Sequence, residues 1–417
     1  MKSTGNMRVV ARFAGAVFVL IVLIAVVVAT VPAYNTTNGT PGSIVEFVFE
    51  ERVDPVGIAG ATTPLFEHFE HPAPQYAVDV YTLRFWSRDA DGSPLEALST
   101  VYIPVVSTQQ EAPVLAFLSG TTGVGDQCAP SREQPEVIRW GWYRQNMLAY
   151  AGQGIITIFP DYLGFNDPRI PQRYFSAAAE GHLMLDALRA TRRLFVERER
   201  DIRSAIRPGP GNVTAGYSQG GHAALAAADM NVSYAPEIRL DGAIGFGSTN
   251  SVETLMREAA YYTPYILLSY RSIYGAELID YERLIQSRWI PTLEDDVMGM
   301  CVEEFQLFFP FDGQELYTPE FYESLHAHRL DQDFPLLKRI LDENETGLSG
   351  HGKPVLMIQG NQDIIITNPA QRQYVERLRA SGSDVEYVEM EGVRHRHTRP
   401  AGFARSVDFI HKVTAND

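Results

Sequence analysis

The sequence predicts an α/β protein with a mostly parallel, doubly wound sheet and a helical cap inserted between two of its strands. Short apolar runs, typical of strands buried on both faces, alternate with helix-patterned segments along most of the chain. One predicted strand runs directly into a helix through a serine that has glycines two residues before and after it. Residues 248–350 form a helix-patterned stretch far longer than the roughly dozen residues that a crossover between parallel strands needs.

The composition is that of an acidic globular protein. The 417 residues are 45% apolar and 21% charged, which is enough for a sizeable core in one large domain or two. The formal net charge is −16. It argues against nucleic acid as a partner, because no basic stripe offsets phosphate repulsion. It also argues against electrostatic binding of the whole protein to anionic lipid.

The first element along the chain is an uncharged apolar segment at 13–31, preceded by Arg8 and Arg12. Its length is about that of a membrane-spanning helix, yet residues 31–33 also fit a signal-peptide cleavage site. Residues 1–34 are therefore expected to be a cleaved signal peptide or a retained membrane anchor. Both alternatives place the rest of the chain outside the cytoplasm, where it is either secreted or anchored through 13–31.

Two neighbouring strands are expected where the core begins. Residues 35–78 form an N-terminal segment that starts with a flexible linker at about 34–43. The first part of the core spans 79–247 and opens with the runs "VYTLRFWSR" and "ALSTVYIP". They flank Asp-Ala-Asp-Gly at 89–92, which predicts a hairpin.

Central parallel strands are expected next. The runs "APVLAFLSG" and "GIITIFPDY" are short and apolar without alternation. A helix follows at about 178–199, where apolar residues recur with a period of about 3.6 residues. A strand at 212–215, its helix and the run "LDGAIGF" complete this half. Strands that alternate with helices in this way imply a mostly parallel sheet.

Residues 248–350 are interpreted as the inserted cap, and an elaborated crossover is the alternative. Pro264 falls inside the cap's apolar stretch "AAYYTPYILLSYRSIYG", where it is expected to break a helix. The second part of the core spans 351–417. It contains the strands "KPVLMIQG" and "DVEYVEM", with a helix at about 369–380 between them.

The stretch "NVTAGYSQGG" places Ser218 at a sharp turn from strand to helix. Gly216 and Gly220 let neighbouring backbone approach without a Cβ clash. The serine Oγ is then expected at the carboxyl end of the strand, where the backbone N–H of Gln219 points at the same space and can bind an oxyanion. A tight turn that happens to contain a serine is the alternative, so the pattern needs catalytic partners.

A serine hydroxyl needs a base within hydrogen-bond reach, and the base needs an orienting carboxylate. In doubly wound hydrolases these residues follow in the order Ser, Asp or Glu, His. Asp363 lies just past "KPVLMIQG", and His395 lies past "DVEYVEM". One helix and one strand separate them, which brings both to the same sheet edge. They are the predicted acid and base partners of Ser218.

Other residues compete for these roles. Asp363 could merely cap a turn, and His397 could be the base. Gly392 favours His395, because a glycine three residues earlier lets the loop bend towards the serine. His222, four residues after Ser218, is expected to lie on the helix that follows the turn (the elbow helix), to point away from Ser218 and to serve only in packing. His182 begins a helix without an identifiable carboxylate partner.

The second oxyanion donor is expected in the loop "GTTG" that follows "APVLAFLS". The backbone N–H of Thr121 or of Thr122 is the candidate, and the sequence does not separate the two. A plain glycine turn is the alternative. Asp161 and Tyr162 end the next strand near the same crevice, where they either shape the pocket or serve only structure.

The chain has two cysteines, Cys128 and Cys301. In an exported protein this even count suggests one disulfide. Two unrelated buried thiols are the alternative. Metal binding is not expected, because the sequence has no Cys-x-x-Cys pair and the histidines at 395 and 397 lack the spacing of metal ligands on a helix.

Four stretches together resemble the secretory lipases of the α/β-hydrolase superfamily, the group that includes Candida antarctica lipase A. They are "SGTTGVGDQCAPS", "FPDYLGF", "GYSQGGHAA" and "QGNQDIIITNPA". The resemblance covers about residues 110–400. It implies an α/β-hydrolase fold and a triad of Ser218, Asp363 and His395.

The resemblance also implies a helical cap over an acyl-binding site. It further implies a disulfide from the oxyanion-loop region to the cap, which matches Cys128 and Cys301. One departure concerns Ser119, since relatives often place a histidine before the Gly-Thr pair. The departure bears on the details of the oxyanion pocket and not on the class of reaction.

These features predict a secreted or membrane-anchored serine ester hydrolase that works through an acyl-enzyme. Acyl glycerides are the expected substrates, by the resemblance and by the aromatic, apolar cap, and shorter esters are the close alternative. No cofactor or metal is expected. A peptidase or acyltransferase with the same triad, or a non-catalytic surface protein on a hydrolase fold, are the competing hypotheses.

Overall fold

The computed structural model describes residues 39–415 except 135–136. The expected signal peptide or anchor at 1–34 lies outside the described residues. Within the described ranges, no helix combines the length and apolar character needed to cross a membrane. The chain from Gly39 onward forms one compact unit.

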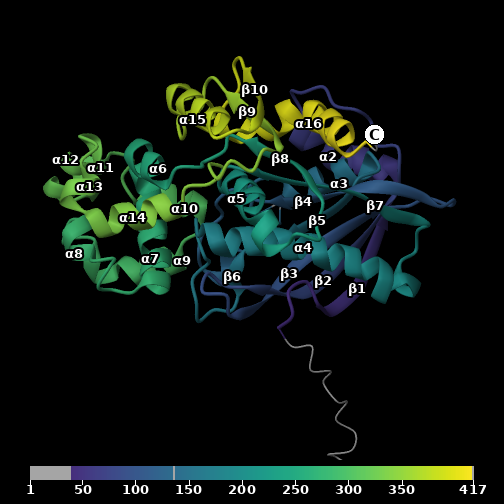
Figure 1. Ribbon diagram of the computed structural model, residues 1–417, viewed down its shortest axis with the longest axis horizontal. Coiled ribbons are helices and arrows are strands. Elements are labelled where there is room, and N and C mark those ends of the chain that lie inside the picture. The colour runs from purple at the N-terminus through teal and green to yellow at the C-terminus, as the bar shows by residue number, and fades with distance from the viewer. Residues whose placement is uncertain (1–38, 135–136, 416–417) are drawn as a thin grey trace, which may run out of the picture. The chain divides into compact units, whose positions relative to one another are not determined.

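Nine strands form one sheet in the order β1-β2-β3-β5-β4-β7-β8-β9-β10 (Figure 1). Antiparallel pairing joins β1 to β2, β2 to β3 and β3 to β5, whereas the pairs from β5 through β4, β7, β8 and β9 to β10 are parallel. The predicted mostly parallel sheet is therefore confirmed. The strands are β1 (Ile44–Val53), β2 (Val78–Arg88), β3 (Pro94–Pro104), β4 (Gln110–Leu118), β5 (Ile156–Pro160), β7 (Ile206–Tyr217), β8 (Leu240–Phe246), β9 (Pro354–Gly360) and β10 (Asp384–Met390).

The hairpin between β2 and β3 turns at the predicted Asp-Ala-Asp-Gly. The Gly92 N–H donates to the Asp89 carbonyl at 3.0 Å, and Gly92 has a φ of 82°, which favours glycine. The N-terminal segment holds more structure than the sequence predicted, namely β1 and the helix α2 (Pro55–Phe66). Phe47 of β1 stacks on Tyr81 of β2 at 4.6 Å between ring centroids, which fixes this strand at the sheet edge.

Helices cover both faces of the sheet (Figure 1). The helices α4 (Ala177–Glu197) and α5 (Gln219–Tyr234) pack together on one face. The helices α2, α3 (Tyr143–Gly152) and α16 (Thr398–Thr414) cover the other, where the rings of Phe66, Tyr150 and Phe403 meet. Because α4 lies within two residues of the predicted helix at 178–199, and α15 (Asn368–Ala380) of the one at 369–380, both predictions are confirmed.

Between β8 and β9 the chain is almost entirely helical, and we call residues 248–350 the cap. Its only strand-like pairing among these described residues is an isolated bridge between Ile285 and Tyr317. The expectation that Pro264 breaks a helix is wrong. Pro264 lies in the first turn of α7, where a missing N–H is tolerated, so it begins a helix. The cap helices are α6 (Val252–Glu258), α7 (Thr263–Tyr274), α8 (Tyr281–Leu284), α9 (Leu293–Gly299), α10 (Val302–Phe308), α11 (Gly313–Leu316), α12 (Pro319–His326), α13 (Leu330–Asp333) and α14 (Pro335–Glu343).

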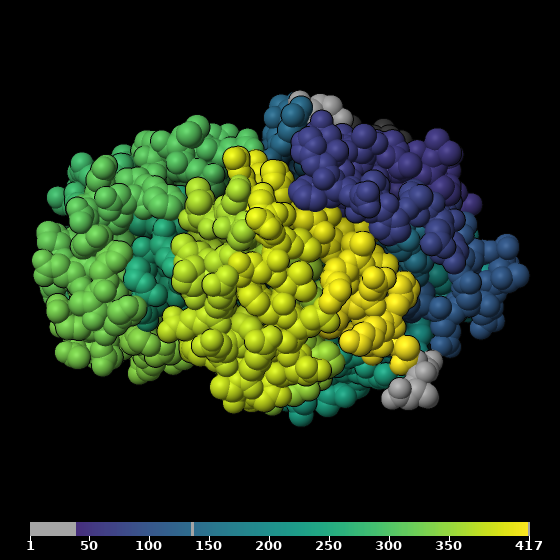
Figure 2. All heavy atoms as spheres, turned by 90° about the horizontal axis from the view of Figure 1, so that it is seen from above, coloured from purple at the N-terminus to yellow at the C-terminus, as the bar shows by residue number. Residues whose placement is uncertain are grey.

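The cap has an aromatic interior of its own and borders the core. Tyr265 of α7 stacks on Phe305 of α10 with ring centroids 3.6 Å apart, and both side chains are buried. Seen from above, the green cap borders the yellow C-terminal part of the core, which in turn borders the purple N-terminal residues (Figure 2). The cap therefore joins the core beside the elements that follow β9.

Candidate active site

Ser218 lies between the end of β7 and the start of α5, in a strained backbone conformation. Its φ of 52° and ψ of −112° are unusual for a residue with a side chain, and such strain costs on the order of 1–3 kcal/mol. A Cβ on Gly216 would lie 2.1 Å from the Gly220 backbone, and one on Gly220 would lie 2.1 Å from the Leu118 carbonyl oxygen. Gly216 is therefore required by the close approach of β7 to the start of α5, and Gly220 by the close approach of α5 to the end of β4.

Three side chains from three strand ends form a continuous hydrogen-bonded chain. The Nε2 of His395 lies 3.0 Å from the Oγ of Ser218, and its Nδ1 lies 2.7 Å from the Oδ2 of Asp363. Asp363 follows β9, and His395 begins the short 3₁₀ turn after β10 (His395–His397). Because β7, β9 and β10 run parallel, their carboxyl ends meet at one edge and bring the three residues together.

The carboxylate of Asp363 is fully buried and held in place by the protein. Its Oδ1 accepts from the backbone N–H groups of Ile365 and Ile366, at 2.9 and 3.1 Å, and its Oδ2 also accepts from the Gln359 amide at 3.0 Å. Burial opposes ionisation, but the charge and hydrogen bond of His395 and the backbone donors outweigh it, so the pKa of Asp363 is lowered. The group is therefore an anion that orients the imidazole.

The competing histidines make other contacts. His397 packs its ring 6.0 Å from that of Phe69, and burial together with the neighbouring arginines lowers its pKa. The His182 ring lies 4.3 Å from that of Tyr234, and its Nδ1 lies 3.2 Å from the Asp89 carbonyl oxygen. Among the histidines in the described part of the chain, His395 alone contacts Ser218.

His222 belongs to a buried polar network that the sequence did not predict. Glu180, at the start of α4, accepts from the Gln219 side chain at 2.7 Å and from the Phe175 N–H at 3.1 Å. Its other oxygen lies 2.5 Å from the His222 Nδ1, while the His222 Nε2 lies 2.7 Å from the carbonyl of Asn344 in the cap. Since a carbonyl can only accept, Nε2 carries a proton. The network thus anchors the first residue of the elbow helix.

The only sequence signal for this network is an acidic residue inside the apolar start of a helix, in "AAAEGH". Glu180 is almost fully buried, and a buried carboxylate requires hydrogen-bond partners. Its partner lies on another helix, so only the packing of α4 against α5 identifies it. Because Glu180 accepts a hydrogen bond from the Gln219 side chain, it helps to position Gln219.

The loop at residues 120–123, which the sequence predicts to supply the second oxyanion donor and which we call the oxyanion loop, begins beside Ser218: a Cβ on Gly120 would lie 3.3 Å from the Ser218 Cβ. The Gly120 N–H donates to the Tyr143 hydroxyl at 2.9 Å, so that N–H is already used. Thr121 lines the cavity in front of Ser218, and its hydroxyl bonds the Tyr174 hydroxyl at 2.7 Å. Thr122 is buried, and its carbonyl accepts from the N–H of Val302 in the cap at 2.9 Å.

Tyr143 is held by a buried cation. The Arg399 guanidinium lies 4.7 Å from the centre of the Tyr143 ring and 4.9 Å from that of Tyr217, so it is sandwiched between them. It donates to the Asn146 side chain at 3.0 Å and to the Gly141 carbonyl. Burial raises the pKa of Tyr143 to about 12, so its hydroxyl stays neutral. This cluster fixes the start of the oxyanion loop.

The sequence left open whether Asp161 and Tyr162 shape the pocket or serve only structure. Asp161 accepts two hydrogen bonds from Ser131, and burial raises the pKa of its carboxyl. The Tyr162 hydroxyl donates to the Ser119 carbonyl at 2.6 Å. Neither Asp161 nor Tyr162 lines the cavity, so both serve structure. Ser119 is fully buried beneath the loop.

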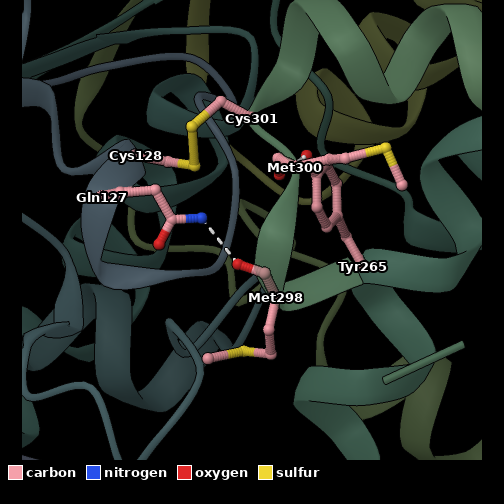
Figure 3. Close-up of a disulfide and its surroundings, with 6 residues drawn as sticks. All are labelled: Gln127, Cys128, Tyr265, Met298, Met300 and Cys301. Atoms are coloured by element: carbon pink, nitrogen blue, oxygen red, sulfur yellow. Dashed lines mark hydrogen bonds between the residues drawn. A yellow bond between two sulfur atoms is a disulfide. The ribbon is translucent and has the colours of Figure 1, made fainter. Parts of the chain in front are cut away.

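A disulfide joins Cys128 to Cys301 across 173 residues of sequence, as the resemblance implied (Figure 3). Cys128 follows the oxyanion loop, and Cys301 directly precedes α10 of the cap. A Cβ on Gly123 would lie 2.6 Å from the Cys128 Sγ, so the disulfide packs tightly against the loop. The bond therefore ties the loop and the cap together.

Hydrogen bonds on both sides of the disulfide strengthen this connection. The Gln127 amide donates to the Met298 carbonyl at 2.6 Å, drawn as a dashed line in Figure 3. The Tyr265 hydroxyl donates to the Met300 carbonyl at 2.9 Å. The segment that precedes Cys301, residues 298–300, is thus bonded both to the core, through Gln127, and to the cap, through Tyr265.

A cavity of about 750 Å³ opens in front of Ser218. The cap contributes two tyrosines and α10 to its wall, and the loops after β9 and β10 contribute isoleucines and two arginines. Its lining residues are Thr121, Trp140, Tyr217, Ser218, Tyr261, Tyr262, Val302, Gln306, Gln362, Ile364, Ile365, Arg394, His395 and Arg396. The arrangement can place a hydroxyl nucleophile, a base and an apolar ligand in one space.

Comparison with known proteins agrees with this architecture. The secretory lipase family model matches residues 146–417. A secreted triacylglycerol lipase of Malassezia furfur is 24% identical over 332 residues, which cover 74% of this chain and 79% of that protein.

Two solved structures share the fold. The rice cell wall degrading esterase LipA of Xanthomonas oryzae is 16% identical, with a TM-score of 0.69 over 89% of this chain and 98% of that one. Candida antarctica lipase A is 17% identical, with a TM-score of 0.65 over 92% of this chain and 85% of that one. The fold is that of the α/β hydrolases.

Proposed function

Because the chain belongs to the secretory lipase family, we propose that it is a serine ester hydrolase that releases fatty acids from acyl glycerides. The observation that supports this proposal is the hydrogen-bonded chain from Ser218 through His395 to Asp363 at the edge of an apolar cavity. The family and the secreted relative support an extracellular location. Retention by an anchor at residues 13–31 remains the alternative to release.

In the proposed reaction, the Nε2 of His395 accepts the Ser218 proton as Oγ attacks the ester carbonyl carbon. The resulting oxyanion is stabilised by the Gln219 N–H and, on the loop side, by the Thr121 N–H. Thr121 is preferred to Thr122 because Thr121 lines the cavity, whereas Thr122 is buried and bonded to the cap.

The remaining steps form the acyl-enzyme and then hydrolyse it. His395 donates its proton to the alcohol oxygen as the bond between that oxygen and the carbonyl carbon breaks, leaving an acyl-Ser218 ester. Water then gives a proton to His395 as its oxygen attacks the acyl carbon. His395 returns that proton to the Ser218 Oγ as the bond between Oγ and the acyl carbon breaks, which releases the fatty acid and restores the serine. The buried Asp363 anion stabilises the imidazolium at each stage.

The cavity supports an acyl ester substrate. Tyr261, Tyr262 and Val302 of the cap face Ile364 and Ile365 of the core across it. Apolar surface of this kind stabilises an acyl chain by about 0.8 kcal/mol per buried methylene group. A peptidase or an acyltransferase would use the same three residues, so assays with ester, amide and alcohol acceptors distinguish these activities.

The test of the proposal is labelling by a fluorophosphonate probe. The Ser218→Ala variant is expected to lose labelling and to lose on the order of 10⁴–10⁶-fold in kcat on an ester. The matched control is Ser233→Ala, an exposed serine on the same helix α5, which should label as the unaltered protein does. Labelling that survives in Ser218→Ala would remove Ser218 as the nucleophile.

A further inference from the structure

The two residues on either side of His395 are arginines, and both line the cavity. Arg394 and Arg396 are both exposed to solvent. In the described part of the chain, no carboxylate lies within ion-pair distance of either one, whereas many other arginines are paired. Two unpaired cations therefore face the space where substrate binds.

The cavity wall holds no opposing charge. Among the described residues that line it there is no aspartate or glutamate, although the whole chain carries a net charge of −16. Asp363 lies behind His395 and is already bonded to it. Glu67 and Glu303 line a neighbouring hollow that Arg396 shares, without forming an ion pair with it. A concave site lined by one sign of charge attracts a ligand of the opposite sign.

The chemistry of ester cleavage determines which part of the substrate meets these arginines. In the tetrahedral intermediate, the carbonyl carbon bears the serine oxygen, the oxyanion, the acyl carbon and the alcohol oxygen. His395 must lie within reach of the alcohol oxygen to protonate it. The alcohol portion therefore lies beside His395 and its neighbours Arg394 and Arg396, and the acyl chain extends in the remaining direction.

We propose that Arg394 and Arg396 form a subsite for a negatively charged group on the alcohol portion of the ester. The inference rests on the proposed serine hydrolase function and specifies its substrate further. A phosphate or a carboxylate fits, because the guanidinium fork binds both in the same manner. The natural substrate is then an acyl ester whose alcohol is an anion, rather than a fully neutral glyceride.

The experiment compares two octanoyl esters that carry either a carboxylate or its neutral methyl ester at the same position of the alcohol portion. One is 4-nitro-3-(octanoyloxy)benzoic acid, and the other is its methyl ester. The measured quantity is the ratio of kcat/KM for the acid to that for the methyl ester, because losses common to both substrates cancel in it. In 20 mM salt we expect the ratio to be about ten, and to fall towards one at 1 M salt, where exposed charges are screened.

The ratio is expected to fall about three-fold in each of R394Q and R396Q, and to reach about one in the double variant, mainly through KM. The lysine variants R394K and R396K keep the charge and should retain much of the preference. The matched control is R405Q, an exposed arginine that pairs with Glu386 away from the cavity. A ratio that is unchanged in the double glutamine variant, or a wild-type preference for the methyl ester, would overturn the subsite.

A second arm separates the two anions. Octanoyl glycerol 3-phosphate and octanoyl lactate present a phosphate and a carboxylate on their alcohols. The substrate whose kcat/KM falls further in the double variant identifies the anion, and equal insensitivity of both contradicts the proposal. Failure to hydrolyse any of the four esters would instead count against the proposed hydrolase function.

Discussion

The two sides of Ser218 are built in different ways. On one side, Asp363 and His395 stand at the ends of neighbouring parallel strands, and their partners are local backbone groups of the core. On the other side, the oxyanion loop at 120–123 depends on distant segments: Tyr143, and Cys301 and Val302 of the cap. The direct hydrogen-bond partners of Asp363 and His395 thus belong to the core, and the Asp363 loop reaches the cap only further along, where Thr367 bonds Glu258 of α6. The loop at 120–123 bonds the cap directly.

Perturbations of the cap should act mainly on the oxyanion side of Ser218. A change in the cap should alter stabilisation of the oxyanion and fit of the acyl chain, while leaving proton transfer through His395 intact. A change near β9 or β10 should impair proton transfer through His395 and leave stabilisation of the oxyanion intact. Three experiments test this division.

The largest effect is expected on the base side. His395→Ala should lower kcat by on the order of 10⁴–10⁶-fold, because Ser218 loses the group that accepts its proton. His397→Ala should cost less than about five-fold, since its ring packs near Phe69 and not at Ser218. Hydrolysis of p-nitrophenyl octanoate measures both. The reverse ranking would move the base to His397 and break the assignment of this side.

An intermediate effect is expected when the cap is freed from the oxyanion loop. The Cys128→Ser, Cys301→Ser double variant should be less stable by up to about 5 kcal/mol in the chain-entropy model for a loop of this length, often less in practice. Its kcat should also fall by about ten-fold, because Thr121 loses part of its positioning.

Two controls sharpen this experiment. Mass spectrometry of unreduced peptides should recover the disulfide in the unaltered protein. Reduction should bring that protein to the kcat of the double serine variant, while leaving the variant itself unaffected. A folded double variant with full kcat would show that the disulfide contributes to stability alone. The oxyanion side would then depend on the cap no more than the base side does.

The smallest effect is expected when the acyl chain of the substrate is lengthened by one methylene group. The efficiency kcat/KM on p-nitrophenyl esters should rise from acetate towards medium or long chains, by up to about four-fold for each added methylene group. Tyr262→Ala should flatten this rise, because it removes apolar wall from the cap. A maximum at acetate followed by a steep fall would identify a small-ester enzyme and contradict the lipase proposal.

The base side was also the side that the sequence predicted best. Ser218, Asp363 and His395 each follow a strand, and the order of strands in a parallel sheet brings their ends to one edge. The hairpin at 89–92 and the helices α4 and α15 follow from turn chemistry and periodicity in the same way. These features depend on short stretches of chain, so a single sequence is enough to predict them.

What escaped prediction depends on packing between distant segments. The contact of Glu180 with His222 exists only because α4 lies against α5. The choice between Thr121 and Thr122 depends on which of them faces the cavity, and the sequence carries no signal for that. The strand β1 was not predicted, and the packing of Phe47 on Tyr81 shows how it joins the sheet.

The disulfide between Cys128 and Cys301 has a consequence for how the protein is made. At about 5–20 residues per second, the ribosome reaches Cys301 roughly 9–35 s after Cys128, since 173 residues separate them. Cys128 is an unpaired thiol throughout that interval. Because the chain has only these two cysteines, no wrong pairing within one chain exists, and the single error open to it is a bond to another molecule. Dilution of the nascent chains, rather than disulfide isomerisation, is then what protects its yield.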